Sequence, residues 1–121
     1  MQTYLQHGRD GERIAVQLLK ARGYQVLCSN WRYKHLEIDV IAREGNQLVF
    51  VEVKTRSSDA FGLPFEAVDW KKQGRLARAA ERYIAAHQYH GEIRFDVVSI
   101  LYSERDQTYR TQLIKDAFWP E

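Results

Sequence analysis

Two short apolar runs with a charge at every second position constrain the fold of this chain more than any other feature. They span residues 37–40, Glu-Ile-Asp-Val, and residues 51–54, Val-Glu-Val-Lys. Each run is predicted to be a buried strand, in which side chains two residues apart point to the same face. The charged pairs expected to share a face are Glu37 with Asp39 and Glu52 with Lys54. The apolar side chains expected on the opposite face are Ile38, Val40, Val51 and Val53.

The charges on these strands need a partner, because a charge near the core of a sheet is costly unless it is paired or binds a metal. A turn signal, Glu44-Gly45-Asn46, predicts a hairpin that brings the two strands together. Asp39 and Glu52 would suit Mg²⁺, and Lys54 could orient or deprotonate a water that attacks a phosphodiester. The alternative is a solvated ladder of salt bridges, with Asp39 opposite Glu52 and Lys54.

The rest of the chain predicts one α/β domain over residues 1–121, with a mixed central sheet flanked by helices. Helices are expected over residues 4–22 and 65–87, strands over 24–31, 36–43, 47–54, 93–102 and 109–115, and a loop over 55–64. The expected order is α-β-β-β-α-β-β. A single cysteine and the lack of an apolar run of roughly 20 residues favour a cytoplasmic protein with no membrane association.

The first predicted helix places a carboxylate on its apolar side. Glu12 falls within the arc formed by Ala15, Val16 and Leu19 when residues are spaced at the helical period. A carboxylate directed toward the core could be a further metal ligand or could bind a metal-bound water. The alternative is an edge residue that reaches solvent or caps the start of the helix.

The second predicted helix separates its charges from its apolar residues. The basic positions that form one stripe are Lys71, Arg75, Arg78 and Arg82, and the opposite, apolar face is Leu76, Ala79, Ala80 and Tyr83. Lys72 and Gln73 are expected nearer the carboxylates, and Arg32, Lys34 and Arg56 add positive charge near the strand ends. This pattern is typical of a surface that contacts nucleic-acid phosphates, or of an ordinary solvated helix face. Trp31, Trp70 and Trp119 could stack on bases, but we expect them to pack.

Together these residues resemble the YraN family of small bacterial proteins, within the restriction-endonuclease-like PD-(D/E)xK nuclease superfamily. The motifs that carry the resemblance are Gly11-Glu12, Asn30-Trp31-Arg32, residues 37–42, residues 49–56, Lys72-Gln73, residues 94–98 and residues 114–118. The ExK spacing alone is a weak signal, whereas the ordered set covers almost the whole chain. One departure is Leu36, which stands where the family usually has glycine before Glu-Ile-Asp.

The resemblance implies a restriction-endonuclease-like fold and a metal-dependent DNA nuclease. It implies that Asp39 and Glu52 bind Mg²⁺ or Mn²⁺ and that Glu12 assists. Lys54 would serve the attacking water, with Glu37 in support. The family is similar to Holliday junction resolvases, which act as dimers on four-way junctions, although that specificity does not transfer with the catalytic residues. The expected substrate is DNA, branched or damaged DNA included, and a homodimer is an expected assembly. A non-catalytic DNA-binding protein on the same fold is the alternative.

Overall fold

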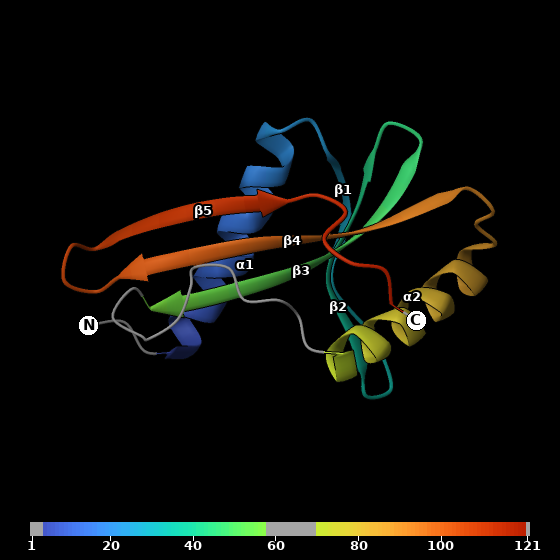
Figure 1. Cartoon of the computed structure of the whole chain (residues 1–121), viewed down its shortest axis with the longest axis horizontal. Helices are drawn as coiled ribbons and strands as arrows, with labels where there is room; N and C mark the ends of the chain where they lie inside the picture. Colours follow the sequence, from blue (N-terminus) through green and yellow to red (C-terminus); the bar gives the residue numbers. More distant parts are fainter. Residues whose placement is uncertain (1–3, 58–69, 121) are drawn as a thin grey trace.

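The computed structural model, which describes residues 4–57 and 70–120 with side chains from Asp10 onward, confirms the predicted order α-β-β-β-α-β-β and the mixed sheet (Figure 1). The helices are α1 (Tyr4–Ala21) and α2 (Trp70–His87). The strands are β1 (Gln25–Tyr33), β2 (Leu36–Glu44), β3 (Gln47–Ser57), β4 (Glu92–Ser103) and β5 (Thr108–Ile114). Gly23, with φ of 88°, ends α1 in the left-handed conformation that glycine adopts without steric cost.

The five strands lie in the order β1-β2-β3-β4-β5, and only β3 and β4 run parallel. A parallel pair needs a crossover, and α2 lies in the connection between these two strands. Figure 1 shows the β1–β2 hairpin running steeply across the other strands toward the first turn of α2. The sheet therefore places an end of β2 beside an end of α2.

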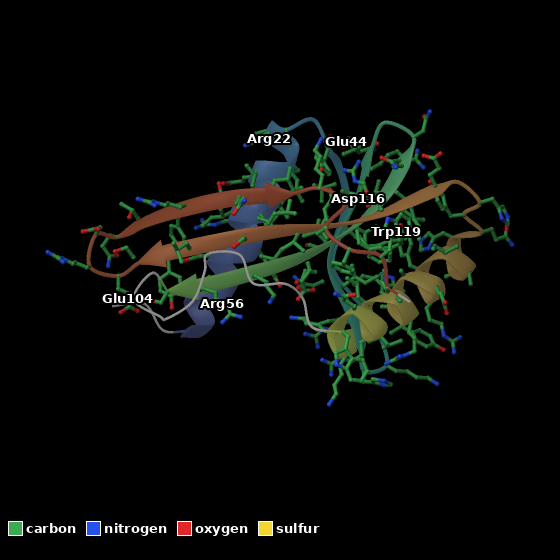
Figure 2. The ribbon with its side chains drawn as sticks, in the orientation of Figure 1. Arg22, Glu44, Arg56, Glu104, Asp116 and Trp119 are labelled. Atoms are coloured by element: carbon green, nitrogen blue, oxygen red, sulfur yellow. The ribbon has the colours of Figure 1, made fainter. Side chains whose placement is uncertain are left out.

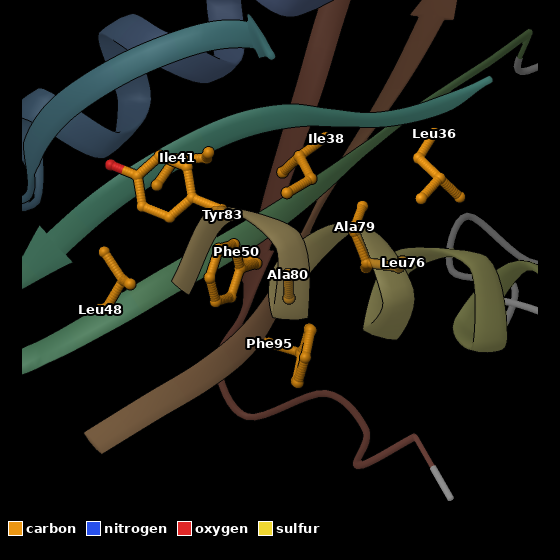
Figure 3. Close-up of a cluster of buried hydrophobic side chains, with 10 residues drawn as sticks. All are labelled: Leu36, Ile38, Ile41, Leu48, Phe50, Leu76, Ala79, Ala80, Tyr83 and Phe95. Carbon is orange, nitrogen blue, oxygen red and sulfur yellow. The ribbon is translucent and has the colours of Figure 1, made fainter. Parts of the chain in front are cut away.

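Each face of the sheet has its own buried cluster beneath one helix. The α2 cluster is drawn in Figure 3 and contains Leu36, Ile38, Ile41, Leu48, Phe50, Leu76, Ala79, Ala80, Tyr83 and Phe95. The α1 cluster contains Ala15, Leu19, Tyr24, Val40, Ala42, Val49, Val51, Val98 and Ile100. Residues of β3 alternate between the two clusters, so this strand is buried on both faces. Its sequence is therefore a nearly continuous apolar run.

Two sequence expectations about these strands are wrong. β3 continues to Ser57 because β4 pairs with it over Thr55–Ile100 and Ser57–Tyr102, so residues 55–57 are strand and not loop. Residues 58–69, which include the predicted start of the second helix, lie outside the described residues. Ile38 and Val40 do not share a face, since Ile38 belongs to the α2 cluster and Val40 to the α1 cluster.

The break in alternation at Ile38 and Val40 coincides with an irregularity in the neighbouring strand. Asn30 of β1 has φ of 54°, and it lies between Trp31, which pairs with Ile38, and Ser29, which pairs with Val40. Asparagine tolerates this left-handed conformation better than most residues do. The hairpin is therefore turned relative to the rest of the sheet at the level of Asp39.

A buried network of charges connects the segment after α1 and the segment after β5 to the sheet. Asp96 is fully buried and accepts hydrogen bonds from Arg94 Nε at 2.8 Å, from the Tyr24 hydroxyl at 2.7 Å and from the Asp116 backbone N–H at 2.9 Å. Arg94 Nη2 also donates to Glu44 Oε1 at 2.8 Å, and Figure 2 shows Glu44 and Asp116 at the same end of the sheet. Burial and the hydrogen bond to Asp96 raise the pKa of Tyr24, so its hydroxyl stays a donor.

No helix within residues 4–57 and 70–120 is long and apolar enough to cross a membrane.

Replacing Asp96 by alanine is expected to lower the free energy of unfolding by about 3–5 kcal/mol, because Arg94 would keep a buried charge without its main partner. Asp106→Ala, in the exposed β4–β5 turn, is the control and should cost less than about 1 kcal/mol. Urea unfolding followed by circular dichroism measures both. A cost below about 1 kcal/mol for Asp96→Ala would show that the network does not hold the fold.

Candidate active site

The candidate site lies where β2 and β3 separate. Their pairing ends at Val40 and Val51, so Asp39 and Glu52 are the first residues beyond the last pair. The backbone N–H of Val53 donates to Asp39 Oδ2 at 2.8 Å. A carboxylate thus accepts the backbone hydrogen bond at the point where β2 leaves β3, and this fixes Asp39 against β3.

A pocket of about 340 Å³ opens at this separation. It is lined by His35, Leu36, Glu37, Asp39, Glu52, Val53, Lys72, Arg75 and Leu76. The acidic side chains come from β2 and β3, and the basic ones from the first two turns of α2. The pocket therefore brings together residues that lie more than 30 positions apart in the sequence, with carboxylates on one wall and cations on the other.

A side-chain hydrogen bond joins Asp39 to Glu52 in this pocket. Burial raises the pKa of Asp39 from its ordinary value of 3.8 to about 8, and the charge of Glu52 and a side-chain hydrogen bond to Glu52 act in the same direction. The Val53 N–H partly opposes the rise, and the charge of Glu12 adds to it. Two carboxylates this close cannot both ionise without a cation between them.

Lys72 supplies a positive charge to the same carboxylates. Its ammonium forms an ion pair with Glu52 Oε1, and the Glu52 side chain is almost fully buried. Burial lowers the pKa of Lys72, but the hydrogen bond to Glu52 and the charges of Glu52 and Asp39 outweigh it, so the net pKa is raised. Lys72 was expected nearer the carboxylates than the basic stripe, and the structure pairs it with Glu52. Its contact with nucleic acid stays a prediction.

Glu12 approaches Asp39 from α1, on the other face of the sheet. Gly11 makes this approach close, because a Cβ at this position would collide with the Thr55 hydroxyl of β3. Glu12 is half-buried and does not line the pocket, yet its charge acts on Asp39. The expectation that Glu12 points toward the carboxylates is thus consistent with the structure, while its role as a metal ligand stays a prediction.

Two further predicted site residues, Glu37 and Lys54, lie at the margin of the site. Glu37 lines the pocket but forms a solvent-exposed ion pair with Arg32 of β1, with 3.3 Å between Arg32 Nη2 and Glu37 Oε2. Such exposed pairs contribute little to stability. Lys54 is half-buried on β3, and strand alternation places it on the same sheet face as Glu52.

The basic stripe of α2 is confirmed as a surface. Its members Lys71, Arg75, Arg78 and Arg82 are all exposed, and the apolar face opposite them is buried. Gln73 is half-buried on the same helix. Arg56 lies near the end of β3, far from α2 in Figure 2, so it is not part of this surface.

His35 is a pocket residue, although its place in the sequence favours an ordinary loop histidine over one near the site. It precedes β2 and lines the pocket with Leu36 and Glu37. Its spacing to other histidines and to Cys28 matches no metal motif, so no pattern in the sequence could identify it. The strand geometry alone brings it to the pocket.

The donor set fits a small divalent cation, because a proton and an ammonium together supply two positive charges to Asp39 and Glu52. Hard carboxylate oxygens in this number are the ligands that Mg²⁺ takes from proteins. In the present conformation, however, no three His, Cys, Asp or Glu side chains of the described residues are grouped to hold a metal ion. A cation would have to displace the ammonium of Lys72 from Glu52.

Comparison with known proteins identifies relatives along most of the chain. The model of a family described as "Uncharacterised protein family UPF0102" matches residues 11–100, a span that contains Glu12, Asp39, Glu52 and Lys54. A UPF0102 protein of Caldicellulosiruptor bescii is 47% identical over 115 residues, which cover 93% of this chain and 97% of that protein. One from Chlorobium chlorochromatii is 42% identical over 118 residues, covering 94% and 92%. One from Beutenbergia cavernae is 53% identical over 95 residues, covering 78% and 80%.

Asp39→Asn is expected to stabilise the protein at alkaline pH. A pKa raised from 3.8 to about 8 means that the contribution of Asp39 to stability is complete below about pH 4 and is lost as pH rises to about 8. Asparagine can accept from the Val53 N–H and donate to Glu52 at every pH. Its gain over wild type should therefore be small at pH 5 and reach about 1–3 kcal/mol at pH 9.

Thermal and urea unfolding at the two pH values measure this gain. Asp106→Asn removes an exposed carboxylate and should show no such dependence on pH. Equal stability of Asp39→Asn and wild type at pH 9 would mean that the pocket does not raise the pKa of Asp39.

Proposed function

This chain belongs to the UPF0102 family, as its resemblance to the YraN proteins predicts, and we propose that it is a metal-dependent nuclease that hydrolyses phosphodiester bonds in DNA. One observation carries the proposal. The hydrogen-bonded carboxylates of Asp39 and Glu52 meet at a strand separation, in a pocket that Lys72 and Arg75 of α2 also line. Buried carboxylates held this close are costly for a fold and are typical of sites that bind a cation.

In this proposal Asp39 and Glu52 hold Mg²⁺ or Mn²⁺, and Glu12 adds negative charge from α1. The bound metal would polarise the phosphoryl oxygen and lower the pKa of a bound water. Lys54, on the face of β3 that carries Glu52, would orient or deprotonate the attacking water and stabilise the developing negative charge. The hydrogen bond from the Val53 N–H keeps Asp39 in place throughout, because it does not depend on the metal.

Lys72 has two roles in this proposal. Before the metal binds, its ammonium neutralises Glu52 and keeps the buried carboxylate from destabilising the fold. A cation held by Asp39 and Glu52 would compete with Lys72 for Glu52, and the Lys72 ammonium would then be available to a DNA phosphate. Arg75 lines the pocket and continues outward into the basic stripe, so the DNA backbone would follow α2 away from the carboxylates.

A second candidate is a DNA-binding protein without catalysis. The observation that favours it is the ion pair between Lys72 and Glu52, since it occupies the carboxylate that a metal would need. In that case the acidic residues hold α2 in place and only the basic stripe contacts DNA. The two candidates differ in whether a divalent metal binds and whether any DNA is cut.

Nuclease assays on single-stranded, duplex and four-way-junction DNA with Mg²⁺ or Mn²⁺ test the first candidate. Asp39→Asn and Lys54→Ala are expected to reduce the cleavage rate about 100-fold or more, because each removes a group that acts on the metal or the water. Glu92→Gln, an exposed acidic residue at the start of β4, is the control and should leave the rate unchanged. The nuclease is refuted if the wild type cuts none of these substrates or if the variants cut as fast as the wild type. The non-catalytic DNA-binding protein would then be the remaining candidate.

A further inference from the structure

Trp70 is the least buried large apolar side chain among the described residues, with 76% of its surface exposed. The other two tryptophans contact aromatic rings. Trp31 meets Tyr83 edge-on with 5.7 Å between ring centroids, and Trp119 meets Phe95 edge-on at 6.0 Å. Packing, expected for all three tryptophans, is therefore wrong for Trp70. An exposed indole at the start of a basic helix is a candidate contact surface.

One turn further along α2, Gly74 occupies a helix interior without a structural reason. Glycine there costs about 1 kcal/mol relative to alanine. A Cβ at Gly74 would meet Arg78 Nη1 at 3.6 Å, which is an ordinary contact. Gly11 in α1 differs, because a Cβ there would collide with Thr55. Among the described residues, therefore, neither packing nor backbone geometry requires glycine at position 74.

Trp70, Gly74 and Arg78 follow each other at intervals of four residues, so they lie along one side of the helix. The missing side chain leaves a hollow of about 380 Å³, lined by Trp70, Lys71, Gly74, Arg75 and Arg78. It has a flat indole at one end, a guanidinium at the other and cations around its rim. We name this hollow the Trp70 slot.

We propose that the Trp70 slot binds an unpaired base of the DNA strand whose backbone passes the carboxylate pocket. The inference rests on the proposed function in taking DNA as the ligand, and it names the substrate class as DNA with unpaired nucleotides. A base offers a flat π-face to the indole and to the guanidinium, while its phosphates meet the lysine and arginine side chains. A base inside a duplex is already stacked on its neighbours and cannot enter.

The position of Arg75 connects the slot to the candidate site, because this residue lines both the slot and the carboxylate pocket. A phosphate bound at Arg75 would lie between the two, with a base on one side in the slot and the strand continuing toward Asp39 and Glu52 on the other. Neither a free phosphate ion nor an acidic peptide would make use of an exposed indole beside an empty helix position.

The test measures binding of two fluorescein-labelled DNAs by anisotropy, with EDTA present so that no cleavage occurs. One is a single-stranded oligothymidylate and the other a fully paired duplex of equal length. Trp70→Ala should weaken binding of the single strand about 5- to 150-fold, which corresponds to 1–3 kcal/mol for one stacked base. Binding of the duplex should change less than about twofold.

Gly74→Ala is the sharper variant, because it places a methyl group on the floor of the slot, where a base would lie, and improves the helix. It should raise the melting temperature and at the same time weaken binding of the single strand, a combination that damage to the fold cannot produce. Trp119→Phe, at an exposed tryptophan on the C-terminal segment, is the control and should change neither quantity.

The proposal that the slot binds a base would be refuted if wild type, Trp70→Ala and Gly74→Ala bound the single strand with equal affinity. It would also be refuted if the variants lost affinity equally for the single strand and the duplex. Either result, with metal-dependent cleavage intact, leaves the proposed nuclease function standing. If the wild type binds the single strand through Trp70 but cuts no DNA with Mg²⁺ or Mn²⁺, the nuclease function is refuted. The proposal that the Trp70 slot binds a base would then still hold.

Discussion

The hydrogen bond from the Val53 N–H to Asp39 is the interaction on which the candidate site depends. A backbone donor at the edge of a broken ladder needs an acceptor, and a carboxylate from the departing strand supplies it. The bond lets β2 turn away from β3 without leaving the Val53 N–H unsatisfied. It also places Asp39 beside Glu52, since the two residues directly follow the last strand pair. The pocket, the raised pKa of Asp39 and the approach of α2 all follow from that separation.

The electrostatic cost of this arrangement explains the residues around it. Two adjacent carboxylates in a partly buried pocket need compensating positive charge. The fold supplies it as a proton on Asp39 and an ammonium from Lys72. In the proposed nuclease, a divalent cation would replace both. Carboxylates that are neutralised only by a proton and an ammonium contribute little to the stability of the fold. The same pair of carboxylates is suited to binding a metal ion. The Arg94–Asp96 network contrasts with it, because there the buried charges are hydrogen-bonded to one another and only hold the fold.

Most of the fold could be predicted from sequence, because its central strands are strongly apolar, glycine marks the end of α1 and the β2–β3 turn, and α2 separates charged from apolar residues. The spacing of Glu52 and Lys54 likewise predicted their common face. Period-two alternation failed at Ile38 and Val40, since the left-handed Asn30 on the neighbouring strand turns the hairpin there. The ion pair of Lys72, the place of His35 and the exposure of Trp70 depend on how α2 docks against the β1–β2 hairpin. No local pattern encodes that docking.

Equilibrium binding of Mn²⁺ at a fixed neutral pH tests the central claim most directly, with wild type compared to Asp39→Asn and Lys72→Gln. If a divalent cation replaces the ammonium of Lys72 on the carboxylates, wild type binds the ion and Asp39→Asn binds it at least about tenfold more weakly. Lys72→Gln should then bind it several-fold more tightly, because the competing charge is gone. Absence of binding at millimolar Mn²⁺ in all three proteins, or equal affinity in all three, would contradict the account.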